Sequence, residues 1–231
     1  MSAVLGMSAR TVADQIGDRL RSELLAGAYP IGKPLREEEL ARHFGVSRHP
    51  IRKALQKLTL EGLLNARPNC GVVVATSQRE HVEGLLTPMR KQLELYALQL
   101  AFPKLNGAQR GEWQTILRRM QRAGEDQNAQ EVLGHDAAFH QQLLIAAGLE
   151  EMIPVWQGIY ARMRDYHQQG NREYPDLRVV AYVHNRLIES LFSGDLQRAR
   201  IDWDSHLENG DFNKRAKTSW QRQLNATGRK G

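Results

Sequence analysis

The 231-residue sequence lacks both a disulfide pair and a long apolar run. Its one cysteine, Cys70, excludes an intramolecular disulfide and is typical of a reducing compartment. No stretch approaches the roughly 18 apolar residues of a membrane span, and the N-terminus has no basic start followed by an apolar signal core. We therefore expect a cytoplasmic protein.

The sequence also lacks the motifs of common enzyme classes. It has no His-Glu-x-x-His pattern, no Gly-rich phosphate loop and no serine or cysteine nucleophile motif. These absences favour a protein that acts by binding.

Charge is distributed unevenly along the chain. Residues 1–75 hold 11 Lys and Arg against 7 Asp and Glu, whereas residues 76–213 hold 15 against 19. Residues 214–231 hold six basic residues and no acid, which we interpret as a solubilising tail. The basic N-terminal part suits phosphate contacts, but the acidic middle has the wrong sign for an architectural protein that wraps DNA.

Residues 35–65 have the pattern of a helix-turn-helix. Apolar residues at helical spacing predict a short helix that ends at Gly45. Ser47 is expected to cap a second helix by accepting a backbone N–H, and Pro50 falls in its first turn, where a missing N–H is tolerated. The second helix has an inner apolar stripe of Ile51, Ala54, Leu55 and Leu58. Its outer face carries Arg48, His49, Arg52, Lys53 and Lys57.

A basic helix after a glycine turn suits the DNA major groove. An ordinary solvated helix is the alternative, and two flanking features count against it. An earlier helix has Val12, Ile16, Leu20 and Leu24 on one stripe. After the pair, two short strands around Pro68-Asn-Cys-Gly71 form a predicted wing.

Over residues 8–76 these motifs resemble the DNA-binding domain of the GntR family of bacterial transcriptional regulators. The resemblance implies a winged helix-turn-helix in which Arg36, at the start of the first helix of the pair, assists the second helix. The expected DNA contacts are Arg36, Ser47, Arg48, His49, Arg52, Lys53, Lys57, Asn69 and Gly71. Because one such helix reads too few bases for useful specificity, we expect a homodimer on palindromic double-stranded DNA.

Residues 79–212 show helical periodicity without strand alternation or repeats, which predicts an all-α bundle of six or seven helices. The fold class is therefore mostly α, with a basic tail over residues 213–231. The first helix of the bundle is expected to place one apolar stripe inward, made of Val82, Leu85, Leu86, Met89, Leu93, Tyr96, Ala97 and Leu100.

Four ionisable residues lie on the inner stripes of three predicted helices. Asp136 and His140 are one turn apart, and His184 and His206 lie within later stripes. Burying a neutral polar group unpaired costs on the order of 2–7 kcal/mol, and one divalent cation would satisfy all four. Imidazole and carboxylate ligands suit Zn, Ni, Mn or Co. Four separately hydrogen-bonded residues are the alternative.

The spacing Asp136-x-x-x-His140…His184…His206 resembles the metal centre of the FCD domain, the effector domain of the FadR subgroup of GntR regulators. The resemblance covers about residues 79–212. It implies that Arg90 grips the carboxylate of a small organic acid, a role for which a planar guanidinium is suited. The alternative for Arg90 is a surface ion pair with Glu94, four residues on.

Two functions compete on these grounds. The first is a DNA-binding regulator, such as a repressor, whose operator affinity is controlled by a small carboxylate effector near the metal. The second is a metal-dependent hydrolase fused to a winged helix. No inward glutamate is evident to act as its general base, so we expect a regulator without enzymatic activity.

Overall fold

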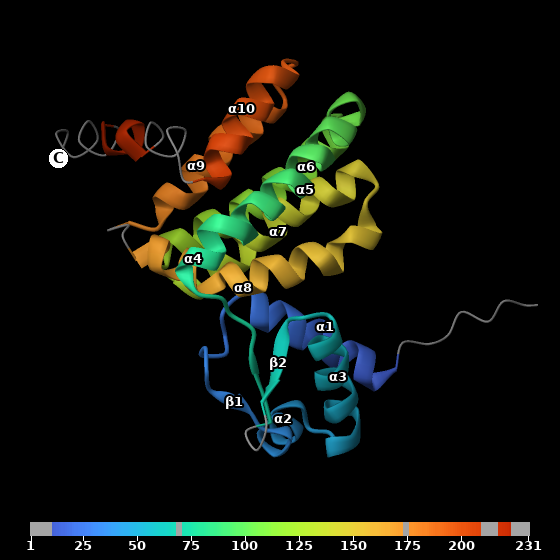
Figure 1. The fold of residues 1–231 in the computed structure, drawn as a ribbon. Coiled ribbons are helices and arrows are strands. Elements are labelled where there is room, and N and C mark those ends of the chain that lie inside the picture. Colours follow the sequence, from blue (N-terminus) through green and yellow to red (C-terminus); the bar gives the residue numbers. More distant parts are fainter. Residues whose placement is uncertain (1–10, 68–70, 173–175, 209–216, 223–231) are drawn as a thin grey trace, which may run out of the picture. The chain divides into compact units, whose positions relative to one another are not determined.

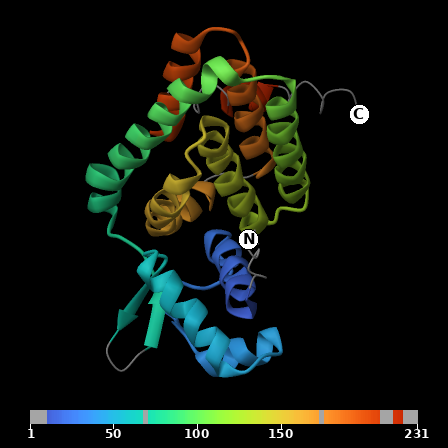
Figure 2. The ribbon, with the colours of Figure 1, turned by 90° about the vertical axis from the view of Figure 1, so that its right-hand side faces the viewer.

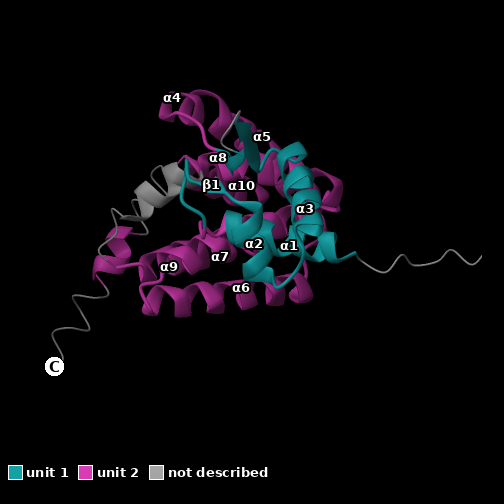
Figure 3. Cartoon of the chain, turned by 90° about the horizontal axis from the view of Figure 1, so that it is seen from below, with its two compact units in different colours: residues 1–24, 29–75 teal, residues 25–28, 76–231 magenta. Residues whose placement is uncertain are grey.

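The structure is a computed structural model that describes residues 11–67, 71–172, 176–208 and 217–222, with side chains described in all of these except residues 164–172. The described part is mostly helical, which confirms the predicted fold class. The chain divides into two compact units (Figure 3). Unit 1 comprises residues 1–24 and 29–75, and unit 2 comprises residues 25–28 and 76–231.

Unit 1 contains a winged helix-turn-helix (Figure 1). Its elements are α1 (Val12–Leu25), β1 (Pro34–Leu35), α2 (Glu37–Phe44), α3 (Arg48–Leu60), β2 (Leu64–Arg67) and β3 (Gly71–Val74). The strands are antiparallel in the order β1-β3-β2, with Leu64 opposite Val74 and Leu35 opposite Val72. The two predicted wing strands are therefore present, and β1 adds a third that the sequence patterns did not reveal.

The turn between α2 and α3 follows the predicted chemistry in part. Gly45 has φ 65°, the left-handed conformation that glycine adopts most easily, and Val46 donates its N–H to the Ala41 carbonyl over 3.0 Å. Ser47 occupies the N-cap position of α3, but its side chain makes no capping hydrogen bond, so that part of the prediction is wrong. The inner stripe of α3 is buried as predicted: Ile51, Ala54, Leu55 and Leu58.

Helix α1 packs into the same core. Ile16, Leu20 and Leu24 are buried, but Val12, the first residue of the helix, is 54% exposed. The apolar stripe predicted for α1 is therefore one turn shorter than expected.

Unit 2 is a helical bundle (Figures 1 and 2). Its elements are α4 (Arg79–His81), the π-helical η1 (Val82–Leu86), α5 (Thr87–Ala101), the 3₁₀ turn η2 (Phe102–Lys104), α6 (Gly107–Glu125), α7 (Ala129–Ala147), the 3₁₀ turn η3 (Glu150–Met152), α8 (Ile153–Arg172), α9 (Arg178–Leu191) and α10 (Leu196–Leu207). Helix α7 packs against α5, α6 and α8, while α10 packs against α5 and α9. The long helices surround a core rich in aromatic residues, including Trp113, Phe139, Trp156 and Trp203.

The inward stripe predicted for η1 and α5 is confirmed in part, because Val82, Leu86 and Ala97 are buried. Leu85, Met89 and Tyr96 were expected to face inward but are 56%, 45% and 57% exposed. The face that is buried instead carries Arg90 and Glu94. Apolar periodicity was misleading here because Arg90 and Glu94 form hydrogen bonds inside the bundle and can therefore occupy the buried face. Leu85, Met89 and Tyr96 lie on the opposite, exposed side. None of the helices in the described part of the chain is long and apolar enough to cross a membrane.

Candidate metal centre and DNA-reading surface

Three helices of unit 2 bring four predicted ligands together. Helix α7 supplies Asp136 and His140, α9 supplies His184 and α10 supplies His206. One ring nitrogen from each histidine lies within 4.8 Å of the others. The Asp136 Oδ1 atom is 2.9 Å from Nε2 of His184 and 4.0 Å from Nε2 of His140. The cluster of Asp136, His140, His184 and His206 thus converges on one point in the bundle.

Hydrogen bonds behind the cluster orient two of its rings. The Nδ1 atom of His184 lies 2.8 Å from the Val180 carbonyl oxygen, which can only accept, so the proton is on Nδ1. The Nδ1 atom of His140 lies 2.8 Å from Oε2 of Glu94, and an ionised carboxylate also only accepts. Both rings therefore direct Nε2 toward the cluster. Metal-binding histidines are typically oriented in this way by a carbonyl or carboxylate on the other ring nitrogen.

The donor set fits a divalent cation. The Nε2 atom of His184 is buried without a hydrogen-bond partner, although it lies 2.9 Å from the Asp136 carboxylate. In a neutral ring with its proton on Nδ1, this Nε2 atom is an acceptor like the carboxylate oxygen, so the two atoms would repel unless a cation lay between them. The Nε2 atoms of His140 and His206 are 3.2 Å apart, a hydrogen-bond distance at which the tautomer of each ring decides the donor. Three imidazoles and one carboxylate form a suitable set for Zn, Ni, Mn or Co.

Glu94 is the residue whose role at this cluster the sequence analysis missed. It is fully buried and accepts hydrogen bonds from four side chains: Arg90 Nε (2.6 Å), Trp156 Nε1 (2.8 Å), His140 Nδ1 (2.8 Å) and Trp203 Nε1 (2.9 Å). Burial alone would raise its pKa, but the charges of Arg90 and His140 outweigh burial and hold the pKa below its ordinary value. The expectation that no inward glutamate lies near the ligands was therefore wrong.

The environment of Glu94 also argues against a role as a general base. Its oxygens are occupied by donors, and it meets His140 on the ring nitrogen that faces away from the cluster. The Arg90–Glu94 spacing was visible in the sequence, but only the fold shows that the pair is buried. Arg90 and Glu94 do form an ion pair, but it is buried and not at the surface, because the Arg90 side chain is only 4% exposed.

Arg90 lies next to the cluster. Its guanidinium carbon is 5.3 Å from the centre of the Tyr160 ring and 5.8 Å from that of Trp156. Tyr160 in turn donates its hydroxyl to Oδ2 of Asp136 over 2.7 Å. Burial would raise the pKa of Asp136, but the contact with His184 and the nearby positive charges hold the pKa well below its ordinary value. The Arg90 guanidinium and the ionised carboxylate of Asp136 thus flank Tyr160 inside the bundle.

The predicted DNA contacts of unit 1 are exposed. On α3, the outward residues Arg48, His49, Arg52, Lys53 and Lys57 all face solvent, and Ser47 is exposed at its N-cap. Arg36 is exposed before α2, and Gly71 at the start of β3. Asn69 and Cys70 lie outside the described residues.

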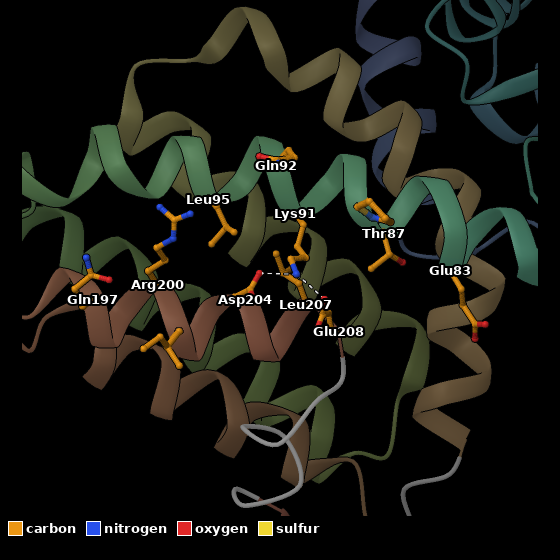
Figure 4. A pocket seen from close by; sticks show the side chains of 12 residues that line it. Glu83, Thr87, Lys91, Gln92, Leu95, Gln197, Arg200, Asp204, Leu207 and Glu208 are labelled. Carbon is orange, nitrogen blue, oxygen red and sulfur yellow. Dashed lines mark hydrogen bonds and ion pairs between the residues drawn. The ribbon is translucent and has the colours of Figure 1, made fainter.

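A separate groove of about 770 Å³ lies between α5 and α10 (Figure 4). It is crossed by Lys91, which pairs with Asp204 over 2.9 Å and Glu208 over 2.5 Å. Asp204 and Arg200 line the groove from α10, on the side of this helix away from His206, so the groove is distinct from the histidine cluster.

Comparisons with known proteins agree with this architecture. Residues 12–74 match the family model described as bacterial regulatory proteins, gntR family, and residues 86–209 match the FCD domain. A probable D-xylose utilization operon transcriptional repressor of Paenarthrobacter nicotinovorans is 27% identical over 201 residues, covering 85% of this chain and 86% of the relative. A gluconate operon transcriptional repressor of Bacillus licheniformis is 24% identical over 198 residues, covering 82% and 79%.

Solved structures share the fold. Escherichia coli McbR/YncC superposes with a TM-score of 0.74 at 20% identity, covering 94% of this chain and all of that one. A GntR regulator from Rhodococcus sp. RHA1 superposes with a TM-score of 0.70 at 18% identity, covering 89% and 97%.

The relatives are regulators, not enzymes, so the expectation of a protein without enzymatic activity is confirmed, and the hydrolase alternative is not supported. Together, the winged helix-turn-helix of unit 1, the helical bundle of unit 2 and both family matches show that this chain belongs to the GntR family of transcriptional regulators and carries an FCD domain.

Proposed function

We propose that this regulator binds operator DNA with an affinity that is controlled by a small organic acid, held beside a divalent metal ion in unit 2. The observation that carries the proposal is the convergence of Asp136, His140, His184 and His206 on one point, with His184 Nε2 lacking a hydrogen-bond partner. The bundle would hold the ligand, and the winged helix would hold the DNA.

Asp136, His140, His184 and His206 are the proposed ligands of one Zn, Ni, Mn or Co ion per chain. The ion would supply a positive centre for the effector's carboxylate. Glu94 and the Val180 carbonyl fix the ring orientations of His140 and His184, so this part of the site is organised before the ligand arrives.

Arg90 is the proposed second contact of the effector. Its Nε atom donates to Glu94, and its planar guanidinium has the fork geometry that suits a carboxylate. Because Glu94 and the Trp156 and Tyr160 rings surround it, the guanidinium is held in place and lies in a low-dielectric setting. A monocarboxylate or dicarboxylate that also reaches the metal would satisfy both positive groups.

The proposed domain roles follow the two units. Residues 8–76 bind DNA, residues 79–212 sense the effector, and residues 213–231 are a basic tail. We assign the DNA contacts to Arg36, Ser47, Arg48, His49, Arg52, Lys53, Lys57, Asn69 and Gly71. Since its ligand is bacterial DNA, we place the protein in the cytoplasm.

We further propose a homodimer on a palindromic operator. The exposed apolar residues Leu85, Met89 and Tyr96 lie on the outer face of η1 and α5, where a solvated helix would carry polar residues. A two-fold contact through this face would bury them and present two copies of α3 to one palindrome. Light scattering that shows a monomer at micromolar concentration would contradict the dimer.

Names among the relatives support repression and an acidic effector. The relatives above are a probable repressor of a D-xylose utilization operon and a repressor of a gluconate operon. Gluconate is a small carboxylate of the class that we propose, which makes it a reasonable first probe.

The test combines metal content with an effector assay on the full-length chain. Elemental analysis, after purification without chelator or histidine tag, should find about one divalent ion per wild-type chain and much less in His184→Ala. Gluconate and other small carboxylates are then screened by thermal shift and by binding to a selected DNA duplex. A carboxylate that changes the DNA affinity of the wild type should have no effect on His184→Ala, whose own DNA affinity should stay close to that of the wild type.

Two outcomes would contradict the proposal. Metal content far below one ion per wild-type chain would mean that the cluster is a polar core in which a protonated His184 pairs with Asp136. An undiminished carboxylate response in His184→Ala would mean that sensing takes place elsewhere.

A further inference from the structure

Three cations on the outer face of α3 are paired with carboxylates from other helices. Arg52 pairs with Glu37 of α2, Arg48 pairs with Glu38 of α2 over 3.0 Å, and Lys57 pairs with Asp14 of α1 over 3.1 Å. The surface that we assign to DNA is therefore partly neutralised by the protein's own acids when no DNA is bound.

One of these pairs differs in its geometry. Glu37 accepts from Nε of Arg52 with one oxygen and from Nη2 with the other, both over 2.9 Å. In the other two pairs, one nitrogen contacts one carboxylate oxygen: Arg48 Nη2 with Glu38 and Lys57 Nζ with Asp14. The Glu37 side chain is 33% exposed, whereas Glu38 is 65% exposed. A two-point contact to a half-buried carboxylate fixes the plane of the guanidinium, which a one-point contact leaves free to rotate.

We propose that Glu37 is a positioning residue for sequence reading: it holds Arg52 by one edge and leaves the other edge for a guanine. The inference rests on the proposed role of α3 in reading DNA. A guanidinium has five N–H donors, and Glu37 takes one on Nε and one on Nη2. The end-on pair formed by Nη1 and Nη2 remains, and this pair can bridge O6 and N7 of guanine. Arg52 can therefore read a base without breaking its contact with Glu37.

The same contact disfavours binding to phosphate alone. Sequence-independent affinity comes from cations that replace the counterions of the DNA backbone. A carboxylate 2.9 Å from the guanidinium already supplies that counter-charge, and it repels an approaching phosphate. The hydrogen bond from Arg52 lowers the pKa of Glu37, so the carboxylate stays ionised at neutral pH. Glu37 should thus weaken nonspecific binding more than specific binding.

The surroundings of the pair are open to a ligand. Arg52 and Glu37 line a hollow of about 900 Å³ between α2, α3 and the wing strands, with Leu55 and Val72 among its apolar residues. Both members of the pair are thus accessible on the face that carries the proposed DNA contacts.

The experiment compares two carboxylate removals from the same helix. Wild-type protein selects a preferred duplex from a random-sequence library, and dissociation constants are then measured for this duplex and for a scrambled one across a salt series. Glu37→Gln is compared with Glu39→Gln, a matched control that removes the same charge from the first turn of α2 but contacts Arg36, at 4.0 Å, instead of α3. Glu37→Gln is also made in an Arg52→Ala background.

We expect Glu37→Gln to lower the ratio of specific to nonspecific affinity by about 5-fold or more, the lower end of what one bidentate base contact supplies. Much of the loss should come from tighter binding to the scrambled duplex. Glu39→Gln should shift both affinities alike, and the effect of Glu37→Gln on the ratio should vanish when Arg52 is absent. If Glu37→Gln lowers the melting temperature more than Glu39→Gln does, Glu37→Asp tests the same contact, because aspartate keeps the charge but is one methylene shorter and cannot hold both Nε and Nη2 of Arg52.

Separate outcomes identify which idea fails. An unchanged ratio in both Glu37→Gln and Glu37→Asp, with a clear loss in Arg52→Ala, would overturn the positioning role alone. A wild-type ratio in Arg52→Ala would instead overturn the assignment of Arg52 as a DNA-reading residue.

Discussion

The two units use charge in opposite ways. In unit 1 the basic residues of α3 are exposed, and three of them pair with acids at the protein surface. In the pair of Arg48 and Glu38, for example, both side chains are more than 60% exposed. In unit 2 the Arg90–Glu94 pair is at most 4% exposed, and the same carboxylate accepts from two indoles and a histidine. Exposed pairs contribute about 0–1 kcal/mol, whereas loss of one partner of a buried pair costs about 3–5 kcal/mol.

This difference suits two kinds of recognition. A surface that must exchange its partners for phosphates and bases needs contacts that break easily. The proposed site for a metal and one small acid would benefit from groups fixed in advance, since fixed groups lose little conformational freedom on binding. Substitutions in unit 2 should therefore appear first as losses of stability, and substitutions on α3 as losses of DNA affinity.

The largest effect is expected from Glu94→Gln. The neutral amide removes the charge opposite Arg90. Its N–H₂ group would also face N–H groups that now donate hydrogen bonds to the Glu94 carboxylate. We expect a loss of about 3–5 kcal/mol in the unfolding free energy. Urea unfolding of the full chain, followed by tryptophan fluorescence, reports on unit 2 because all four tryptophans lie beyond residue 76.

The matched control for that prediction is Glu83→Gln in η1. Glu83 pairs with Arg79 over 2.9 Å, and both side chains are exposed, so its removal should change the unfolding free energy by about 0.5 kcal/mol at most. Equal losses in the two variants would remove the contrast between buried and exposed pairs.

The next largest effect concerns the metal. A ligand that binds only the folded state at 100 times its dissociation constant stabilises that state by about 2.7 kcal/mol. Zn²⁺ at that excess should therefore stabilise unit 2 of the chelator-treated wild type and leave His206→Ala unaffected. His81→Ala, which removes an exposed histidine of α4, is the control and should respond like the wild type. A response in His206→Ala equal to that of the wild type would exclude this residue as a ligand.

Sequence patterns predicted unit 1 well because its signals are local. Gly45, Pro50 and the stripe from Ile51 to Leu58 specify their own turns and helix faces within a few residues. The third strand, β1, was missed because two residues carry no periodicity, and its pairing partner lies nearly forty residues away. Ser47 has the residue type and the position of a cap, but its side chain does not make the bond.

Unit 2 was harder because its polar residues are buried together. The four ligands could be proposed because each interrupts an otherwise apolar stripe, and the structure brings these side chains together. The inward face of α5 was predicted only in part, because hydropathy cannot anticipate that Glu94 accepts hydrogen bonds from side chains of α7, α8 and α10 and is buried with Arg90. The role of Glu94 depends on contacts across 46 to 109 residues of sequence, which no local pattern encodes.

On unit 1, Arg48→Ala should weaken binding to the selected duplex by about 1–3 kcal/mol if Arg48 reads a guanine, with a smaller loss on the scrambled duplex. The free energy of unfolding should be nearly unchanged, because the contact between Arg48 and Glu38 is exposed. Fluorescence anisotropy across a salt series measures both affinities. Arg42→Ala, an exposed position on α2 outside the proposed contacts, is the control. Wild-type affinity and base preference in Arg48→Ala would refute its assignment.

The smallest effect is expected at Lys57. A lysine ammonium binds phosphate as a point charge and carries no base preference, so Lys57→Ala should weaken binding to selected and scrambled duplexes alike. The slope of log K against log salt should become shallower by about 0.9, the value for one phosphate contact.

Asp14, which pairs with Lys57 over 3.1 Å, would then face the duplex without its partner. Some of the lost affinity should therefore return in Lys57→Ala combined with Asp14→Asn, whereas the slope should stay shallow. Lys33→Ala provides the control at another exposed cation of unit 1, and an equal slope change there would mean that Lys57 acts only through net charge.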